Sequence, residues 1–268
     1  MDETVNKFPF VEFSDVSIID EHHGKSLSKL NFTLEKGENL VILGPEGCGK
    51  DLILDLLIGK RAPDTGTVRV NNEIIHDKDQ DSLETYRSKV GYVSFNYGLI
   101  NNLTVLENIL LPLRYHTRMS EEDLIEKAMT FLLKYRIDHK SNQRPQMLTY
   151  NETLRIAFIR ALITDPELLL LDNALGGQCP LGLAKFMELA HVDIEAHHGS
   201  FILATFEAGY FYNYADRFML LYKGENVFDG PVEELTAAAN PYVRQYLYDR
   251  LKGPMDSFHE GLQMAGQK

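Results

Sequence analysis

The chain is poor in cysteine, in long apolar runs and in positive charge. Only two of its 268 residues are cysteine, so no disulfide framework is expected and the cytosol is the simplest compartment. No apolar run reaches the length of a membrane span, and the first residues lack the basic and apolar regions of a signal peptide. The net charge of -12 disfavours a general nucleic-acid binder and direct adhesion to an anionic membrane surface.

Strand-like and helix-like segments alternate along the chain, which predicts an α/β fold. Four apolar runs are typical of central strands in a parallel sheet, namely residues 40–43, 90–95, 168–171 and 201–205. Near the start, residues 11–19 and 30–34 predict an antiparallel β subdomain. Residues 218–228 predict a terminal hairpin, because two apolar runs flank a Lys-Gly-Glu turn.

The middle of the chain has a helical pattern. Residues 103–114, 121–135 and 149–163 carry apolar side chains at helical spacing. Because α/β segments flank them on both sides, they predict a helical subdomain inserted at about residues 98–160. A C-terminal helical tail is expected over residues 237–268.

The most informative segment is the glycine-rich loop Gly-Pro-Glu-Gly-Cys-Gly-Lys at residues 44–50. It follows a predicted strand and precedes a helical run at residues 52–59, which is the context of a phosphate-binding loop, or P-loop. The loop amides and the helix N-terminus would cradle phosphate, and the lysine would reach the outer phosphates. The expected phosphate-binding residues are Gly44, Pro45, Gly47, Gly49 and Lys50.

The residue after this lysine is Asp51, where P-loops carry a Ser or Thr whose hydroxyl binds magnesium. A carboxylate can bind magnesium itself. At about 4 Å and a surface-like dielectric, however, its repulsion with a triphosphate is about 4 kcal/mol before a metal intervenes. The alternative is that Asp51 pairs with Lys50 and closes an empty site, and the sequence leaves both possibilities open.

The order of motifs over about residues 13–253 resembles that of the nucleotide-binding subunits of ABC transporters. Within that family the chain is most similar to the subunits of Mce/Mla-type lipid transport in bacterial envelopes. This closer similarity rests on residues 111–117, 119–123, 228–235 and 241–246. The resemblance implies an ABC-type P-loop NTPase fold with a parallel-sheet core, an antiparallel β subdomain and an inserted helical subdomain, as one domain over residues 8–236.

The resemblance also implies partners and a place in the cell. In this family two subunits face each other head to tail, and each ATP lies between the P-loop of one subunit and a signature helix of the other. Each subunit also receives a short helix from a membrane permease. We therefore expect a homodimer or a heterodimer with another ABC subunit, peripheral on the inner face of the cytoplasmic membrane, with no nucleic-acid partner.

The family residues that handle the terminal phosphate and its water differ in this chain. The run at residues 168–172 matches the Walker B strand, which implies that Asp172 holds magnesium through water. The family glutamate that follows is Asn173 here. An amide cannot accept a proton, so general-base assistance of roughly 10²–10⁴-fold is lost. The aspartate of the next family loop aligns with Cys179.

Two further polar family residues align with phenylalanine. The glutamine that senses magnesium corresponds to Phe95, and the switch histidine that touches the γ-phosphate corresponds to Phe206. A phenyl ring binds neither phosphate nor metal, and two rings near one cleft are expected to bury each other. No catalytic position is therefore predicted to be intact. The degenerate positions are Asp51, Phe95, Asn173, Cys179 and Phe206.

The family signature, Leu-Ser-Gly-Gly-Gln, is also altered. The corresponding residues are Leu148, Thr149, Tyr150, Asn151 and Glu152. The family glycines let phosphate approach bare backbone, whereas here two of these positions carry large side chains. Thr149 and Glu152 fit a capping box, in which the carboxylate supplies the negative charge that a helix N-terminus favours. The alternative is that Glu152 is an ordinary surface residue.

These departures predict a folded pseudo-ATPase, which would be a structural or regulatory subunit of an ABC-type lipid transporter. The missing catalytic groups would all lower the same activation barrier, that of ATP hydrolysis. Little hydrolysis is therefore expected even if the effects of the separate losses are not additive. Two alternatives stay open. The chain is a slow ATPase in which Asp51 and Asp172 share magnesium, or it is a soluble adaptor that has left the transporter. The sequence leaves open whether ATP still binds, and any binding of ATP with magnesium is expected to be weak.

Overall fold

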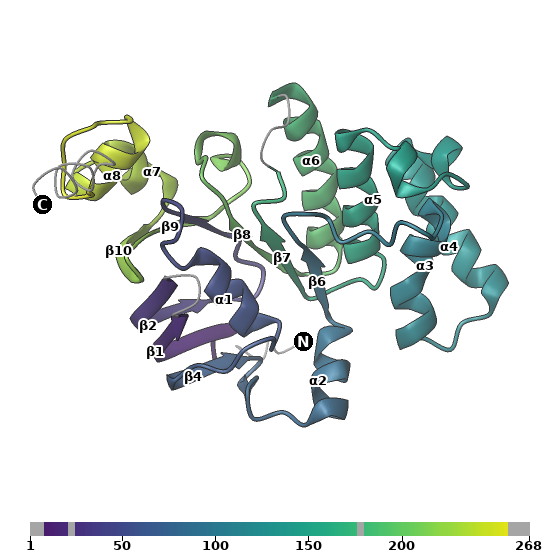
Figure 1. Ribbon diagram of the computed structural model, residues 1–268, viewed down its shortest axis with the longest axis horizontal. Helices are drawn as coiled ribbons and strands as arrows, with labels where there is room; N and C mark the ends of the chain where they lie inside the picture. The colour runs from purple at the N-terminus through teal and green to yellow at the C-terminus, as the bar shows by residue number, and fades with distance from the viewer. Residues whose placement is uncertain (1–7, 21–24, 176–179, 257–268) are drawn as a thin grey trace, which may run out of the picture.

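The computed structural model describes residues 8–20, 25–175 and 180–256. In these ranges two sheets and their helices form an α/β fold (Figure 1). No helix within the described ranges is long and apolar enough to cross a membrane.

The larger sheet has six strands in the order β10-β9-β3-β8-β7-β6. The strands from β9 to β6 run parallel, and β10 returns antiparallel to β9 as the predicted hairpin. The central strands are short apolar runs because both faces of a parallel sheet are covered. Their bounds are β3 (Leu40–Leu43), β6 (Val90–Val93), β7 (Leu168–Asp172), β8 (Ser200–Ala204), β9 (Arg217–Tyr222) and β10 (Glu225–Gly230).

The smaller sheet is the predicted antiparallel subdomain, with the order β2-β1-β4-β5. Helix α1 (Lys50–Leu57) packs between the two sheets, since its Leu52 belongs to the same buried cluster as Leu27 of β2 and Ile202 of β8. The start of α1 is therefore fixed from both sides. The strand bounds are β1 (Val11–Asp20), β2 (Lys25–Leu34), β4 (Thr65–Val70) and β5 (Glu73–Ile74).

The inserted helices lie on one side of the molecule, and the C-terminal helices lie on the opposite side, beyond β9 and β10 (Figure 1). Helix α3 begins two residues after its predicted start, because Thr104 and Glu107 form a capping box there. The helices are α2 (Gln80–Arg87), α3 (Val105–His116), α4 (Glu121–Lys134), α5 (Tyr150–Leu162), α6 (Pro180–Ala196), α7 (Val232–Ala237) and α8 (Pro241–Leu247).

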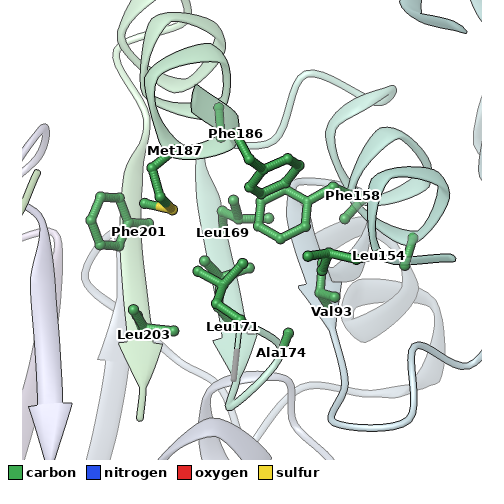
Figure 2. Packing of buried hydrophobic residues seen from close by; sticks show 14 of the residues in the cluster. Val93, Leu154, Phe158, Leu169, Leu171, Ala174, Phe186, Met187, Phe201 and Leu203 are labelled. Atoms are coloured by element: carbon green, nitrogen blue, oxygen red, sulfur yellow. The ribbon is translucent and has the colours of Figure 1, made fainter. Parts of the chain in front are cut away.

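Helices α5 and α6 cover one face of the larger sheet. Figure 2 shows Phe158 of α5 beside Phe186 of α6, over Leu169 and Leu171 of β7. The two rings meet edge to face with centroids 4.2 Å apart, a favourable aromatic geometry. This contact links the inserted helices to the sheet that carries the P-loop.

We expect Phe158→Ala to reduce the free energy of unfolding by about 3–5 kcal/mol, because it opens a cavity in a fully buried position. Urea unfolding followed by circular dichroism measures the change. The control Leu133→Ala removes an exposed side chain of α4 and should cost less than about 0.5 kcal/mol. Equal effects of the two substitutions would contradict the assignment of Phe158 to the shared core.

Candidate functional site

A cleft of about 390 Å³ lies where β3, β7 and β8 end. In open parallel sheets, ligands bind beyond the carboxyl ends of the strands. The cleft brings together most of the P-loop and catalytic positions that the sequence singles out. Its lining consists of Glu46, Gly47, Cys48, Gly49, Lys50, Asp51, Phe95, Asp172, Asn173, Ala204 and Phe206. Cys179 lies outside the described residues.

The P-loop has a backbone that only glycine supports at two positions. Gly44 has φ +148°, and a Cβ there would lie 2.4 Å from the Leu221 carbonyl oxygen. Gly49 has φ +99° and would place a Cβ 2.6 Å from the Ser26 carbonyl oxygen. Both values lie in the region of φ that favours glycine. The loop therefore turns tightly between β3 and the N-terminus of α1, with Gly49 as the N-cap residue.

The Lys50 ammonium is buried and turned toward its own loop. It donates hydrogen bonds to the Gly44 carbonyl, to the Pro45 carbonyl at 3.0 Å and to Cys48 Sγ at 3.5 Å. The ring of Phe206 covers it, with its centroid 4.4 Å from Nζ. Burial lowers the pKa of Lys50, an effect that nearby Cys48, Asp51 and Asp172 partly offset. The loop and one phenyl ring thus surround the lysine.

The expectation that Phe95 and Phe206 bury each other is wrong. Their exposed fractions are 67% and 44%, and no ring contact joins them in the described ranges. Phe95 follows β6 and Phe206 follows β8, and β7 lies between these two strands. Strands two places apart in a sheet are separated by about 9–10 Å. Phe206 instead takes the Lys50 ammonium as its partner, a cation–π contact.

Asp172 and Asn173 follow one another at the end of β7. The Tyr92 hydroxyl of β6 donates to Asp172 Oδ2 at 3.4 Å, and burial raises the pKa of Tyr92, so the hydroxyl stays protonated. Asn173 has φ 45°, a left-handed conformation in which asparagine is enriched. Its N–H donates to the Ala204 carbonyl at 2.8 Å, which ties β7 to β8 at the edge of the cleft.

Two of the carboxylates that line the cleft, those of Asp51 and Asp172, could hold magnesium. Asp51 lies in the first turn of α1 and Asp172 at the end of β7, and both line the cleft with Lys50. Carboxylate oxygens are ligands that magnesium accepts. No group of three or more His, Cys, Asp or Glu side chains forms a metal-binding set in the described part of the chain.

The altered signature segment does not line this cleft; it forms the N-terminus of α5. The predicted capping box is present. The Glu152 carboxylate accepts from the Thr149 N–H at 2.8 Å, and Thr149 Oγ1 accepts from the Glu152 N–H at 3.4 Å. Lys140 lies 3.3 Å from the same carboxylate. These contacts, led by the Thr149 N–H, hold the pKa of Glu152 below its usual value, so the plain surface interpretation is wrong.

Two tyrosines contact the site without having been predicted from the sequence. Tyr92 is bonded to Asp172, as described above. Tyr246 of α8 is bonded to the first glycine of the P-loop, since its hydroxyl accepts from the Gly44 N–H at 3.3 Å. The alternation of strand β6 could have placed Tyr92 on one face of the sheet. No local pattern connects Tyr246 to Gly44, because the two are 202 positions apart.

The comparisons with known proteins identify the fold and the family. A family model described as "ABC transporter" matches residues 27–176. The sulfate/thiosulfate import ATP-binding protein CysA of Pectobacterium atrosepticum is 30% identical, over 85% of this chain and 69% of that protein. The lipoprotein-releasing system ATP-binding protein LolD of Treponema denticola is 32% identical, over 66% of this chain and 78% of that protein.

Among solved structures, the dimeric structure of MJ0796, a bacterial ABC transporter cassette, superimposes with a TM-score of 0.76. Its sequence is 26% identical, and the match covers 83% of this chain and 98% of that chain. The predicted fold class is thereby confirmed. The chain belongs to the ABC transporter family, as an ATP-binding cassette with a P-loop α/β core.

Proposed function

We propose that this cassette is a pseudo-ATPase, with hydrolysis absent or strongly impaired. The observation that carries the proposal is the set of contacts made by the Lys50 ammonium. It donates to the carbonyls of its own loop and lies beneath the Phe206 ring. In the same cleft, Asn173 stands where the family resemblance implies a general base. A site without a general base, whose lysine is already engaged, lacks groups that lower the barrier to phosphoryl transfer.

The altered signature helix supports the same function. The resemblance to the family implies that the N-terminus of this helix binds the ATP held by a partner subunit. Here the N-terminus of α5 already interacts with the carboxylate of Glu152, which is in turn paired with Lys140. A second anion brought to this helix end would meet like charge. We therefore propose that α5 does not complete an ATP site.

We further propose that the protein is a structural or regulatory subunit of a lipid or phospholipid transporter in a bacterial envelope. It would dock on a membrane permease at the inner face of the cytoplasmic membrane, as a homodimer or beside another ABC subunit. Support comes from the Mce/Mla-like segments and from similarity to a protein named as part of a lipoprotein-releasing system. We assign the cassette to residues 8–236, with the helical subdomain at about 98–160, and the tail to residues 237–268.

A slow ATPase is the second candidate, and one observation favours it. Asp51 and Asp172 both line the cleft with Lys50, so their carboxylates are placed in the same cleft where magnesium would bind. Magnesium supplies charge stabilisation for phosphoryl transfer when it is bound. In that case Lys50 would turn from its loop carbonyls toward phosphate.

Purified protein should show ATP turnover with magnesium no faster than that of the Lys50→Ala variant. The expected equality follows from the missing general base and the engaged lysine. Phosphate release, measured with both proteins at several concentrations, tests it. Turnover that is clearly faster in the unaltered protein, and that falls on Asp51→Asn or Asp172→Asn substitution, would establish the slow ATPase instead.

The capping box predicts a pH dependence of stability. The folded-state pKa of Glu152 is lowered, so its carboxylate stabilises the fold above the unfolded-state pKa of about 4.3. This stabilisation is lost as the pH falls through the folded-state pKa. Urea unfolding at pH values from about 6 to 3 should therefore show a smaller loss of stability for Glu152→Gln than for the unaltered protein.

The matched control is Glu126→Gln, which changes an exposed carboxylate in the middle of α4. It should leave the pH dependence unchanged. If the Glu152 and Glu126 variants follow the same pH curve as the unaltered protein, the carboxylate of Glu152 does not serve as the anion of α5.

An affinity-tagged copy, purified from detergent-solubilised membranes of its native cells, should carry an integral membrane permease with it. The expectation follows from the proposed docking role, and mass spectrometry of the purified complex measures it. The Lys50→Ala variant should retain the permease, because a structural subunit does not need an active P-loop. Recovery of the chain without any membrane protein, under conditions that preserve other transporters, would favour the soluble adaptor.

A further inference from the structure

Helix α8 is hydrogen-bonded to the P-loop by the hydroxyl group of Tyr246. This hydroxyl accepts a hydrogen bond from the Gly44 N–H at 3.3 Å. It also lies within donating distance of two carbonyl oxygens, that of Gly44 at 3.2 Å and that of Phe206 at 2.8 Å. Gly44 contacts the Lys50 ammonium with its carbonyl, and Phe206 contacts it with its ring. The Tyr246 hydroxyl thus contacts the backbone of both residues.

Tyr246 is held in place by the helix that carries it. The Asn240 side chain caps α8 and also donates to the Val227 carbonyl of β10 at 2.7 Å. Val243 is fully buried in the main core. On the far side, the Gln245 amide exchanges two hydrogen bonds with the backbone of Met255, at 2.9 and 2.7 Å. The hydroxyl therefore has a fixed position and is not the end of a mobile surface side chain.

The chemistry of this contact differs from ordinary packing. Burial raises the pKa of Tyr246, so the group remains a neutral hydroxyl that can donate and accept at once. A phenylalanine would fill the same space but make none of these bonds. The hydroxyl also meets the Gly44 carbonyl, which accepts from Lys50 as well. The hydroxyl has a single proton, and the Phe206 carbonyl at 2.8 Å is a nearer acceptor than the Gly44 carbonyl at 3.2 Å.

We propose that Tyr246 is a positioning residue of the phosphate site, through which the C-terminal segment holds Lys50 against its loop and keeps Phe206 above it. A phosphate that approaches Lys50 from the side of the Phe206 ring must displace this ring, and the Tyr246 hydroxyl resists the movement by holding the Phe206 carbonyl. Access to the lysine is therefore linked to the docking of α8. This role does not depend on whether the cassette hydrolyses ATP.

The test uses the full chain without nucleotide and the substitution Tyr246→Phe, which removes only the hydroxyl. Two quantities are measured at one pH. The first is residue-resolved amide hydrogen exchange of Gly44 and of the α8 backbone. The second is the labelling rate of the Lys50 amine by an acylating reagent, followed by mass spectrometry, with the exposed Lys60 as an internal reference. The matched control is Tyr242→Phe, a substitution on the same helix whose ring lies against Tyr222.

We expect Tyr246→Phe to speed exchange of the Gly44 amide by roughly three- to tenfold, the loss expected for one hydrogen bond. Labelling of Lys50 should also become faster, while Lys60 and the α8 amides stay unchanged. Tyr242→Phe should alter neither Gly44 nor Lys50.

Three results would overturn the proposal. The first is a folded Tyr246→Phe variant in which Gly44 exchange and Lys50 labelling are unchanged. The second is an equal change in the Tyr246→Phe and Tyr242→Phe variants. The third is faster amide exchange throughout α8 in Tyr246→Phe, which would show that Tyr246 only packs the helix. The two proposals can fail separately, because this test is made without nucleotide. ATP turnover in the phosphate-release assay would refute the pseudo-ATPase but would not affect the role of Tyr246.

Discussion

The burial of the Lys50 ammonium is the constraint on which the cleft depends. An amine in a residue that is only 7% exposed must be solvated by protein groups or by a ligand, because a buried charge without partners is costly. The carbonyls of Gly44 and Pro45 and the ring of Phe206 supply this solvation. Binding of phosphate to Lys50 is therefore a replacement of existing contacts, and its free energy is reduced by what those contacts are worth.

Two helix N-termini also carry a negative charge of the chain's own. Helix α1 has Asp51 in its first turn, and α5 has Glu152. A carboxylate in the first turn interacts favourably with the helix dipole, and at α5 the Glu152 carboxylate also accepts a hydrogen bond from the Thr149 N–H. The charge on Glu152 is further compensated by Lys140. Each of these helix N-termini thus has a carboxylate of the chain in its first turn, so a phosphate brought to either end would meet negative charge that is already there.

The parts of the structure that local patterns determine could be predicted from the sequence, and the long-range contacts could not. Continuous apolar runs placed β3, β7 and β8 in a parallel sheet, and the Thr-x-x-Glu spacing located the cap of α5. The mutual burial of Phe95 and Phe206 was a wrong expectation because it ignored the strand that separates them. The contact between Tyr246 and Gly44 depends on the order of strands in the sheet, which no spacing along the chain encodes.

The sheet order also explains which chain segments lie beside the P-loop. Strands β9 and β8 are the two neighbours of β3, so the chain segments that follow them begin beside the loop that follows β3. The Phe206 loop comes from β8, and the turn after β9 contacts the P-loop, since the Gly224 N–H donates to the Cys48 carbonyl. Strand β10 then runs away from this edge, and α8 comes back toward it, since Asn240 of its cap donates to the Val227 carbonyl near the start of β10. This adjacency is set by backbone pairing and survives any change in the polar groups of the cleft. A contact such as that of Tyr246 with Gly44 can therefore persist whatever side chains line the cleft.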